Sequence, residues 1–205
     1  MSLPLLHVQG LRFTFAQAQR PLFDGLSFTL PAGVSWLGGD EGRGKTTLLR
    51  LLAGRLSPQA GSIATDRPLQ AEELAQQVAW HEASDPAFDQ TEVQDILGRL
   101  VPAGSHKRLP ELMAGLSLQP HLAKPLYQLS TGSRRKVFIA ATLAQPGRLA
   151  LLDQPFTALD APSISFLLAY FRALAESGGR ALLVADYLPP EGVPLAATLN
   201  LDELA

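Results

Sequence analysis

The sequence predicts an α/β fold with a mostly parallel sheet, antiparallel strands near the N-terminus and an inserted helical subdomain. Two segments, Leu11–Phe15 and Leu26–Leu30, alternate apolar and polar residues, which is typical of a sheet with one buried and one solvated face. Later runs are mostly apolar, as expected of parallel strands that helices cover on both faces. These runs are Val34–Leu37, Leu149–Leu152 and Ala181–Ala185.

Three stretches have the period of a helix with one apolar face, and each stands next to one of the apolar strands, as in an α/β domain. They are Thr46–Leu56, Gly132–Leu143 and Ser163–Leu174. From about residue 81 to 128, prolines divide the chain into short helical pieces. We therefore expect one domain over residues 1–205, in which 1–80 and 146–205 form the core and 81–145 the helical subdomain.

Composition excludes several classes of protein. The chain has 205 residues, no cysteine, and 17 basic against 19 acidic side chains, for a formal net charge of −2. The lack of cysteine excludes thiol catalysis and thiolate metal sites, and the near balance of charge argues against a protein that mainly coats nucleic acid. The longest apolar run, Phe166–Phe171, is far shorter than the roughly 20 residues of a membrane span, and we expect no signal peptide.

A phosphate-binding loop follows the strand that ends at Leu37. The segment from Gly39 to Thr46 matches G-x-x-x-x-G-K-[ST], and a helix is predicted to begin at its end, so backbone N–H groups and a helix N-terminus converge on one anion. Lys45 would reach the β- and γ-phosphates and the Thr46 hydroxyl would bind Mg²⁺. The alternative is a glycine-rich turn with a solvated lysine. The predicted contact residues are Gly39, Asp40, Glu41, Gly42, Arg43, Gly44, Lys45, Thr46 and Thr47.

Asp153 ends the apolar strand Leu149–Leu152, where a short carboxylate would face the phosphate-binding loop across a parallel sheet. It would join Thr46 in holding Mg²⁺. Aspartate at a strand end is also a common turn former, which is the alternative interpretation. Together the loop and this carboxylate predict a P-loop NTPase sheet.

Four motifs in order resemble those of the ATP-binding subunits of ABC transporters. Leu129–Ser133, followed by basic residues, is similar to the family signature LSGGQ, and Leu149–Asp160 is similar to its Walker B strand and D-loop. The resemblance covers nearly the whole chain. It implies ATP and Mg²⁺ as cofactors, a head-to-tail dimer with a second copy or a related ABC ATPase subunit, and an integral membrane permease as partner. It also implies a location at the cytoplasmic face of the membrane, through the permease.

The same resemblance assigns roles to single residues. Ser130 and Gly132 would meet the γ-phosphate held by the partner subunit, Phe15 would stack on adenine, and Asp160 would face the partner. Each has a simpler alternative: Ser130 and Asp160 are also typical N-cap residues, and Phe15 is also typical of a core-facing strand.

Departures from the family pattern concern the γ-phosphate chemistry. They are Gln154 in place of the catalytic Glu, Asp186 in place of a His, Ala83 in place of the Q-loop Gln, and Thr131 with Ser133 in the signature. His81 or Glu82 would take the Q-loop position if the loop shifts by one or two residues. An amide can orient water but cannot accept its proton, so Gln154 predicts Mg-ATP binding with slow or absent hydrolysis.

Within the family, the segments Leu22–Leu30 and Thr46–Gly54 are most similar to the haem-exporter subunit of cytochrome c maturation. The leading interpretation is an ATP-binding subunit that binds Mg-ATP and dimerises to drive a membrane permease. Two alternatives stay open. The first alternative is the degenerate half of a heterodimeric ABC ATPase, whose signature serves a partner's intact site. The second is a regulatory module that dimerises with ATP and drives no transport.

Overall fold

The computed structural model describes residues 4–65, 77–82, 85–102 and 106–203. The strands are β1 (Pro4–Phe13), β2 (Phe23–Pro31), β3 (Gly33–Gly38), β4 (Ala60–Ala64), β5 (Val78–Ala79), β6 (Leu149–Asp153), β7 (Ala181–Ala185) and β8 (Leu195–Asn200). The α-helices are α1 (Lys45–Leu52), α3 (Val93–Leu100), α4 (Leu109–Gly115), α5 (Thr131–Ala144) and α6 (Ala161–Ser177). Four 3₁₀ segments join them: η1 (Pro86–Phe88), η2 (His106–Arg108), η3 (Gln119–His121) and η4 (Leu126–Gln128).

Two sheets form the fold, and they confirm the predicted α/β class. The five-stranded sheet has the order β5-β6-β7-β3-β8 with parallel neighbours, and the three-stranded sheet has the antiparallel order β2-β1-β4. In the parallel sheet, Leu37 and Asp153 both pair in register with Ala185. The carboxyl ends of β3, β6 and β7 therefore lie at one edge, which is where the phosphate-binding loop begins.

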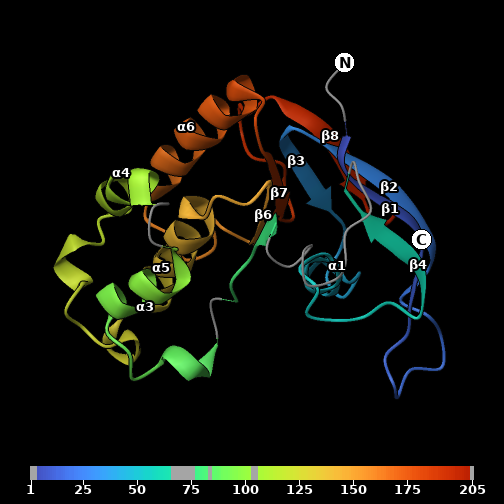
Figure 1. Ribbon diagram of the computed structural model, residues 1–205, viewed down its shortest axis with the longest axis horizontal. Coiled ribbons are helices and arrows are strands. Elements are labelled where there is room, and N and C mark those ends of the chain that lie inside the picture. The colour runs from blue at the N-terminus through green and yellow to red at the C-terminus, as the bar shows by residue number, and fades with distance from the viewer. Residues whose placement is uncertain (1–3, 66–76, 83–84, 103–105, 204–205) are drawn as a thin grey trace.

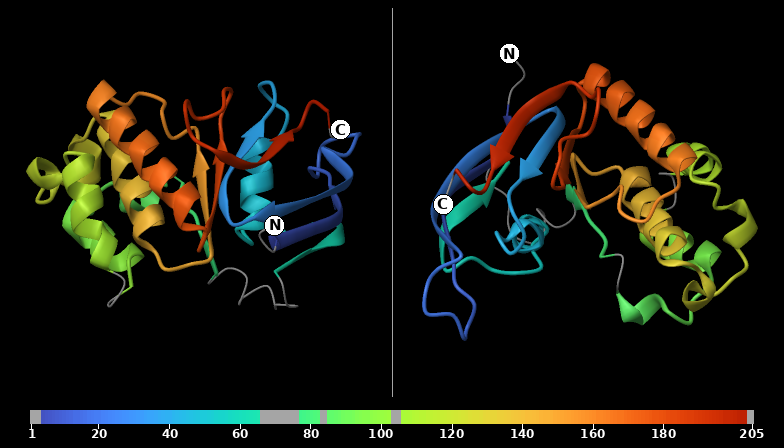
Figure 2. Two further views of the ribbon diagram at one scale, coloured as in Figure 1. Left: turned by 90° about the horizontal axis from the view of Figure 1, so that it is seen from above. Right: turned by 180° about the vertical axis from the view of Figure 1, so that it is seen from behind.

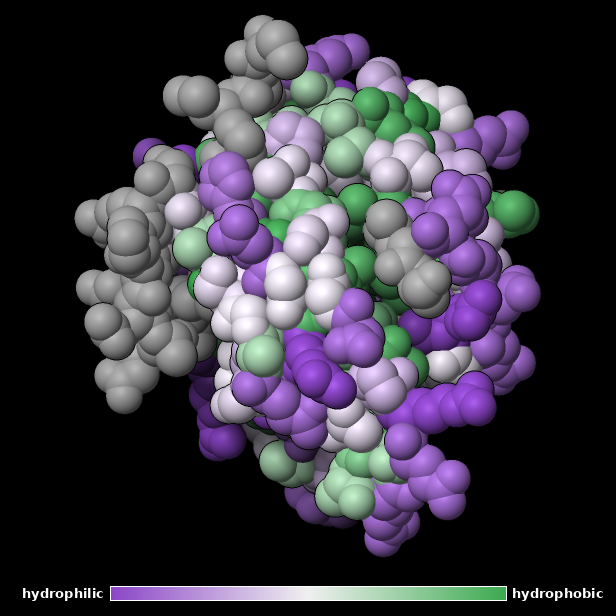
Figure 3. Space-filling view, turned by 90° about the vertical axis from the view of Figure 1, so that its right-hand side faces the viewer, coloured by the Kyte–Doolittle hydropathy of each residue, from purple (hydrophilic) through white to green (hydrophobic). Residues whose placement is uncertain are grey.

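Each face of the parallel sheet contributes to a separate apolar core. On β7, Leu182 and Val184 pack with α3, α4, α5 and α6, whereas Leu183 and its alternate neighbours pack with α1 and the antiparallel sheet. Figures 1 and 2 show the four helices on one side of the sheet and α1 enclosed on the other. Polar residues such as Gln9, Arg12 and Thr29 are exposed on the opposite face of the antiparallel sheet, as its alternating pattern predicted. Figure 3 shows polar, small and apolar residues mixed on this side of the molecule.

Three strands were not predicted, and their composition explains why. β5 has only two residues. Three of the five residues of β4 are Gly or Ala and none of the five is buried, and on β8 only Leu199 is buried. Boundaries also differ from the expectation. β1 starts earlier and ends at Phe13, which leaves Phe15 beyond the strand, and α1 ends well before Leu56 because Gly54 adopts a φ of 67°.

The proline-rich segment forms short helices, as its sequence predicted. Pro86 begins η1 and Pro110 lies in the first turn of α4, two positions where proline needs no backbone donor. These helices share one apolar core with sheet residues such as Leu152, so a division at residues 81 and 145 stays a prediction. None of the described helices has the length and apolar character needed to cross a bilayer.

Candidate nucleotide-binding site

The phosphate-binding loop joins β3 to α1 through backbone that only glycine adopts readily. Gly39, Gly42 and Gly44 have φ values of +136°, +78° and +94°. A Cβ at Gly44 would also lie 2.8 Å from the Leu22 Cδ2 atom and 2.9 Å from the Phe23 ring, so the loop packs closely on β2. The loop thus wraps around the N-terminus of α1 in the form that the sequence motif predicted.

Lys45 is 6% exposed, and its ammonium group points back over the loop. The Nζ atom donates hydrogen bonds to the carbonyl oxygens of Gly39 (2.5 Å) and Asp40 (3.0 Å), and it lies 4.5 Å from the centre of the Tyr187 ring. A phosphate oxygen that enters the loop would replace some of these contacts. Tyr187 is therefore a residue of the site that the loop motif alone did not reveal.

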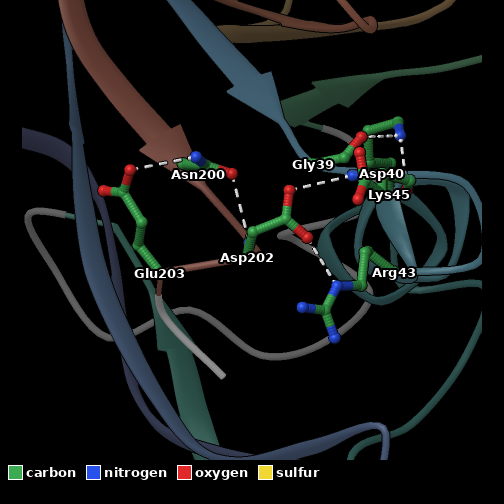
Figure 4. Close-up of polar contacts among 7 residues, drawn as sticks. All are labelled: Gly39, Asp40, Arg43, Lys45, Asn200, Asp202 and Glu203. Carbon is green, nitrogen blue, oxygen red and sulfur yellow. Dashed lines mark hydrogen bonds and ion pairs between the residues drawn. The ribbon is translucent and has the colours of Figure 1, made fainter.

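A second residue outside the motif, Asp202, holds the loop from the C-terminal side (Figure 4). Its Oδ2 atom accepts a hydrogen bond from the Asp40 backbone N–H at 3.0 Å, and its Oδ1 atom pairs with the Arg43 Nε atom at 2.5 Å. The Asn200 side chain in turn accepts from the Asp202 N–H at 3.1 Å. The hydrogen bond from Arg43 lowers the pKa of Asp202. Asp202 follows β8, which was not predicted, so no sequence signal linked it to the loop.

Thr46 and Asp153 form the pair that the metal prediction requires. The Thr46 hydroxyl donates to Asp153 Oδ2 at 2.6 Å, while Asp153 Oδ1 is buried and has no hydrogen-bond partner among the described residues. Burial raises the pKa of Asp153, and the hydrogen bond from Thr46 partly opposes that shift. An unsatisfied buried carboxylate oxygen is costly, and a divalent cation would satisfy it. The donor set therefore fits Mg²⁺.

Few protein groups would hold that ion. Among the described residues there is no group of three or more His, Cys, Asp or Glu side chains placed to bind a metal. Mg²⁺ in phosphate sites characteristically uses one or two protein oxygens, with substrate phosphates and water completing its coordination. The Thr46 and Asp153 pair beside the loop matches that pattern.

Gln154 and Asp186 lie at the ends of β6 and β7, next to this pair. The Gln154 backbone is left-handed, with a φ of 46°; its N–H donates to the Ala185 carbonyl at 2.7 Å, and its carbonyl accepts from the Arg135 guanidinium. The Asp186 N–H donates to the Leu37 carbonyl at 3.2 Å. Burial raises the pKa of Asp186, the Tyr187 N–H lowers it, and the Asp153 carboxylate raises it. Two carboxylates thus share this edge of the sheet.

A cavity of about 560 Å³ opens beside these residues. Its walls include Thr46, Asp153 and Gln154 on the sheet side and Arg134 and Arg135 from α5 on the other. It is large enough for the polar end of a nucleotide and a water molecule.

Comparison with known proteins identifies the family. A family model described as ABC transporter matches residues 23–157. The chain belongs to the ABC transporter family. A Nod factor export ATP-binding protein I from Ralstonia nicotianae is 32% identical over 91% of the chain, which spans 61% of that protein's length. A cytochrome c biogenesis ATP-binding export protein, CcmA, from Pseudomonas putida is 33% identical over 89% of this chain and 90% of its own length.

Solved structures share the fold. The ATP-binding subunit of an ABC transporter superposes with a TM-score of 0.78 at 23% identity, covering 90% of this chain and 80% of the other. The family membership establishes an ATP-binding domain of the ABC type and agrees with the predicted resemblance.

The ABC signature residues have local structural roles. Ser130 is the N-cap of α5, because its hydroxyl accepts from the Ser133 N–H at 3.2 Å. A Cβ at Gly132 would lie 2.1 Å from the Ala158 carbonyl oxygen, so α5 and the D-loop touch there. Neither residue is among the described residues that line the cavity with Asp153. Their role toward a partner's ATP stays a prediction.

Two further residues that the ABC resemblance singled out are Asp160 and Phe15. Asp160 is the N-cap of α6, accepting from the Ser163 N–H at 2.9 Å, and it also pairs with Lys136. Phe15 is 46% exposed and meets Phe13 edge-on at 5.0 Å between ring centres. The core-facing interpretation of Phe15 is therefore wrong, and adenine stacking stays a prediction.

The predicted Q-loop position and its two possible substitutes are Ala83, Glu82 and His81. Ala83 lies outside the described residues. Of its two possible substitutes, Glu82 forms an ion pair with Arg50 on α1, and the His81 ring contacts the Gln145 amide at 2.7 Å. Burial and the nearby Arg55 lower the pKa of His81 to about 4. His81 and Glu82 both line the cavity, so either side chain could supply the polar group of the Q-loop there.

Proposed function

We propose that this chain is a transporter subunit that binds Mg-ATP, dimerises head to tail with a second copy or a related ABC ATPase subunit, and drives an integral membrane permease with weak or absent hydrolysis at its own site. One observation carries the proposal. The Thr46 and Asp153 pair leaves a buried oxygen free for Mg²⁺ beside the phosphate-binding loop. By the family pattern, Gln154 and Asp186 would take the positions that act on the γ-phosphate.

Each group has a defined part in this proposal. Mg²⁺, when bound, would neutralise charge on the β- and γ-phosphates. Lys45 and the loop N–H groups would bind those phosphates, and the Gln154 amide would orient a water molecule without accepting its proton. Loss of a positioned base costs about 10²–10⁴ in rate. The Asp186 carboxylate would add repulsion toward the γ-phosphate in both ground and transition states.

Transport and location follow from the family and its relatives. Both relatives named above are export ATP-binding proteins, so we infer export through a permease and a position at the cytoplasmic face of the membrane. The similarity to a cytochrome c biogenesis protein agrees with the haem-exporter resemblance and favours haem as the exported substrate. Residues 1–80 and 146–205 would form the nucleotide-binding core and 81–145 the helical subdomain.

The test measures ATP turnover and ATP-driven dimerisation on the same purified sample, for the unaltered chain and for Gln154→Glu. We expect ATP to produce dimers of both, slow turnover by the unaltered chain, and turnover up to about 10²-fold faster for Gln154→Glu, at the low end of the range for a general base because Asp186 remains. Lys45→Ala should abolish both signals. Fast turnover by the unaltered chain that Gln154→Glu leaves unchanged would refute weak hydrolysis.

A heterodimer is the second candidate, because Ser130 and Gly132 are retained while Gln154 and Asp186 are not. In that case a related ABC ATPase with an intact Glu would hydrolyse ATP only when mixed with this chain. Ser130→Ala in this chain would then lower the turnover of the mixture, whereas Gln154→Glu would change it little. In a homodimer both sites carry Gln154, so Gln154→Glu would raise turnover clearly, and Ser130→Ala would lower it there as well.

A further inference from the structure

A second cavity lies at the other edge of the parallel sheet. It has a volume of about 590 Å³, and its walls include Arg148 and Arg180, which directly precede β6 and β7. The phosphate-binding loop follows the carboxyl end of β3, so the two sites lie at opposite edges. We call this space the arginine cavity, because Arg108 from η2 also lines it. The volume is within the roughly 300–1,000 Å³ typical of small-molecule sites.

Arg180 places a buried cation in the wall of the arginine cavity. The residue is 6% exposed, and its guanidinium donates to the Leu143 carbonyl at 2.9 Å and the Thr142 carbonyl at 3.2 Å in the last turn of α5. Its Nε atom is buried without a hydrogen-bond partner, and no carboxylate of the described residues lies within ion-pair distance. Helix-end carbonyls compensate only part of a full charge.

The other charges of the arginine cavity increase the positive potential. Burial, followed by repulsion from Arg108, lowers the pKa of Arg180 to about 10, so the side chain stays charged at neutral pH. Among the described lining residues, three arginines face one acidic side chain, Glu111. A buried cation beside a like charge is unfavourable unless an anion joins it.

The remaining wall is apolar and aromatic. The rings of Phe166 and Tyr170 on α6 lie 6.2 Å apart at an angle of 41°, and Leu174 follows one turn later. Burial raises the pKa of Tyr170, which keeps its hydroxyl protonated as a further donor. The cavity therefore combines a cationic end with a surface for an apolar body.

We propose that the arginine cavity binds a small organic anion, a phosphate or carboxylate group carried on an apolar or aromatic body, at a site separate from the ATP site. Arg108 and Arg180 contact the anionic group, and Phe166 and Tyr170 contact the body. Because the cavity reaches α5 through the Arg180 contacts, the bound anion is also linked to the helix that carries the ABC signature.

The test uses phenyl phosphate, with benzoate, inorganic phosphate and phenol as comparison ligands, titrated calorimetrically into the full chain. We expect dissociation constants of about 1 mM or lower for phenyl phosphate and benzoate. Inorganic phosphate should bind at least about tenfold more weakly, and phenol should not bind, because each lacks one half of the required chemistry.

Variants separate the arginine cavity from the ATP site and from effects on folding. Arg108→Gln, an exposed position, should weaken phenyl phosphate about tenfold, whereas Arg99→Gln on α3 and Lys45→Ala should leave its affinity unchanged. Arg180→Gln also removes contacts with α5, so Arg108 is the decisive position. The proposal would be overturned if phenyl phosphate did not bind, if Arg108→Gln bound it with equal affinity, or if Lys45→Ala lost the binding. A parallel measurement uses vesicles that contain phosphatidic acid, and binding to these vesicles alone would also overturn it.

Discussion

Replacing Gly132 with alanine tests whether the start of the signature helix is held against the D-loop. The new Cβ would lie 2.1 Å from the Ala158 carbonyl oxygen, a backbone atom, whereas real Cβ contacts are no closer than 3.0 Å, so the two segments must separate by nearly 1 Å. Ala158 already has a φ of 61° and lies two residues before the α6 N-cap, Asp160. Overpacking costs about 1–3 kcal/mol and a weakened cap about 0.5–2 kcal/mol. We expect Gly132→Ala to lower the free energy of unfolding by about 2–4 kcal/mol.

The assay is urea denaturation followed by circular dichroism, with Gly98→Ala as the matched control. Gly98 lies inside α3, is exposed, and has open space around its Cβ position, so alanine there should stabilise the protein by up to about 1 kcal/mol. If the two variants unfold within 0.5 kcal/mol of each other, the close contact between α5 and the D-loop does not exist in solution.

Three further outcomes follow from other contacts. Tyr187→Leu removes the ring above the Lys45 ammonium, a contact of about 0.5–1 kcal/mol that a bound phosphate would have to replace. The variant should therefore bind ATP about two- to fivefold more tightly in a fluorescent-nucleotide titration. The pKa of His81 is about 4 in the folded chain and 6.5 ordinarily, so the unfolded chain takes up this proton first as the pH drops. The free energy of unfolding should therefore fall by up to about 3 kcal/mol between pH 6.5 and pH 4. His81→Gln should reduce this pH dependence in a series of denaturation curves. Asp153→Asn should weaken ATP binding about tenfold or more with Mg²⁺ present, but not in EDTA.

Controls make these outcomes specific. Tyr127→Leu changes a tyrosine of similar exposure that lies outside the site, and should leave ATP affinity unchanged. An unaltered pH slope in His81→Gln would assign the acid sensitivity to other groups. Equal losses of affinity for Asp153→Asn with Mg²⁺ and in EDTA would contradict a role in holding the ion.

Local patterns predicted the parts of the site that are contiguous in sequence. The loop from Gly39 to Thr46 and the strand before Asp153 were found because their residue types and spacing are set by the nearest backbone. Asp202 was not found, since its contact with the loop depends on β8, an edge strand with only Leu199 buried. Contacts between distant segments leave no periodic signal in either segment.

Two residues of the ABC motifs, one in the signature and one in the D-loop, show a different limit. Ser130 and Asp160 were predicted both as N-caps and as residues that face a partner, and the structure confirms the caps. The hydroxyl and carboxylate types that suit a helix start also suit an intersubunit contact, so a single chain cannot separate the two roles. Arg180 illustrates the converse. No sequence pattern singled it out, and only its burial identified it as a cation of the arginine cavity.

The Asp202 contact has a consequence for the order of events during synthesis. It joins Asp40 to a residue 162 positions later, and β8, which precedes Asp202, pairs directly with the strand that leads into the loop. While the ribosome is still adding those residues, β3 has no neighbour on that side and the loop has no carboxylate to hold Asp40 and Arg43. A nascent chain therefore carries the complete phosphate motif long before it can bind nucleotide in the mature geometry, and nucleotide capture is delayed until Asp202 has emerged.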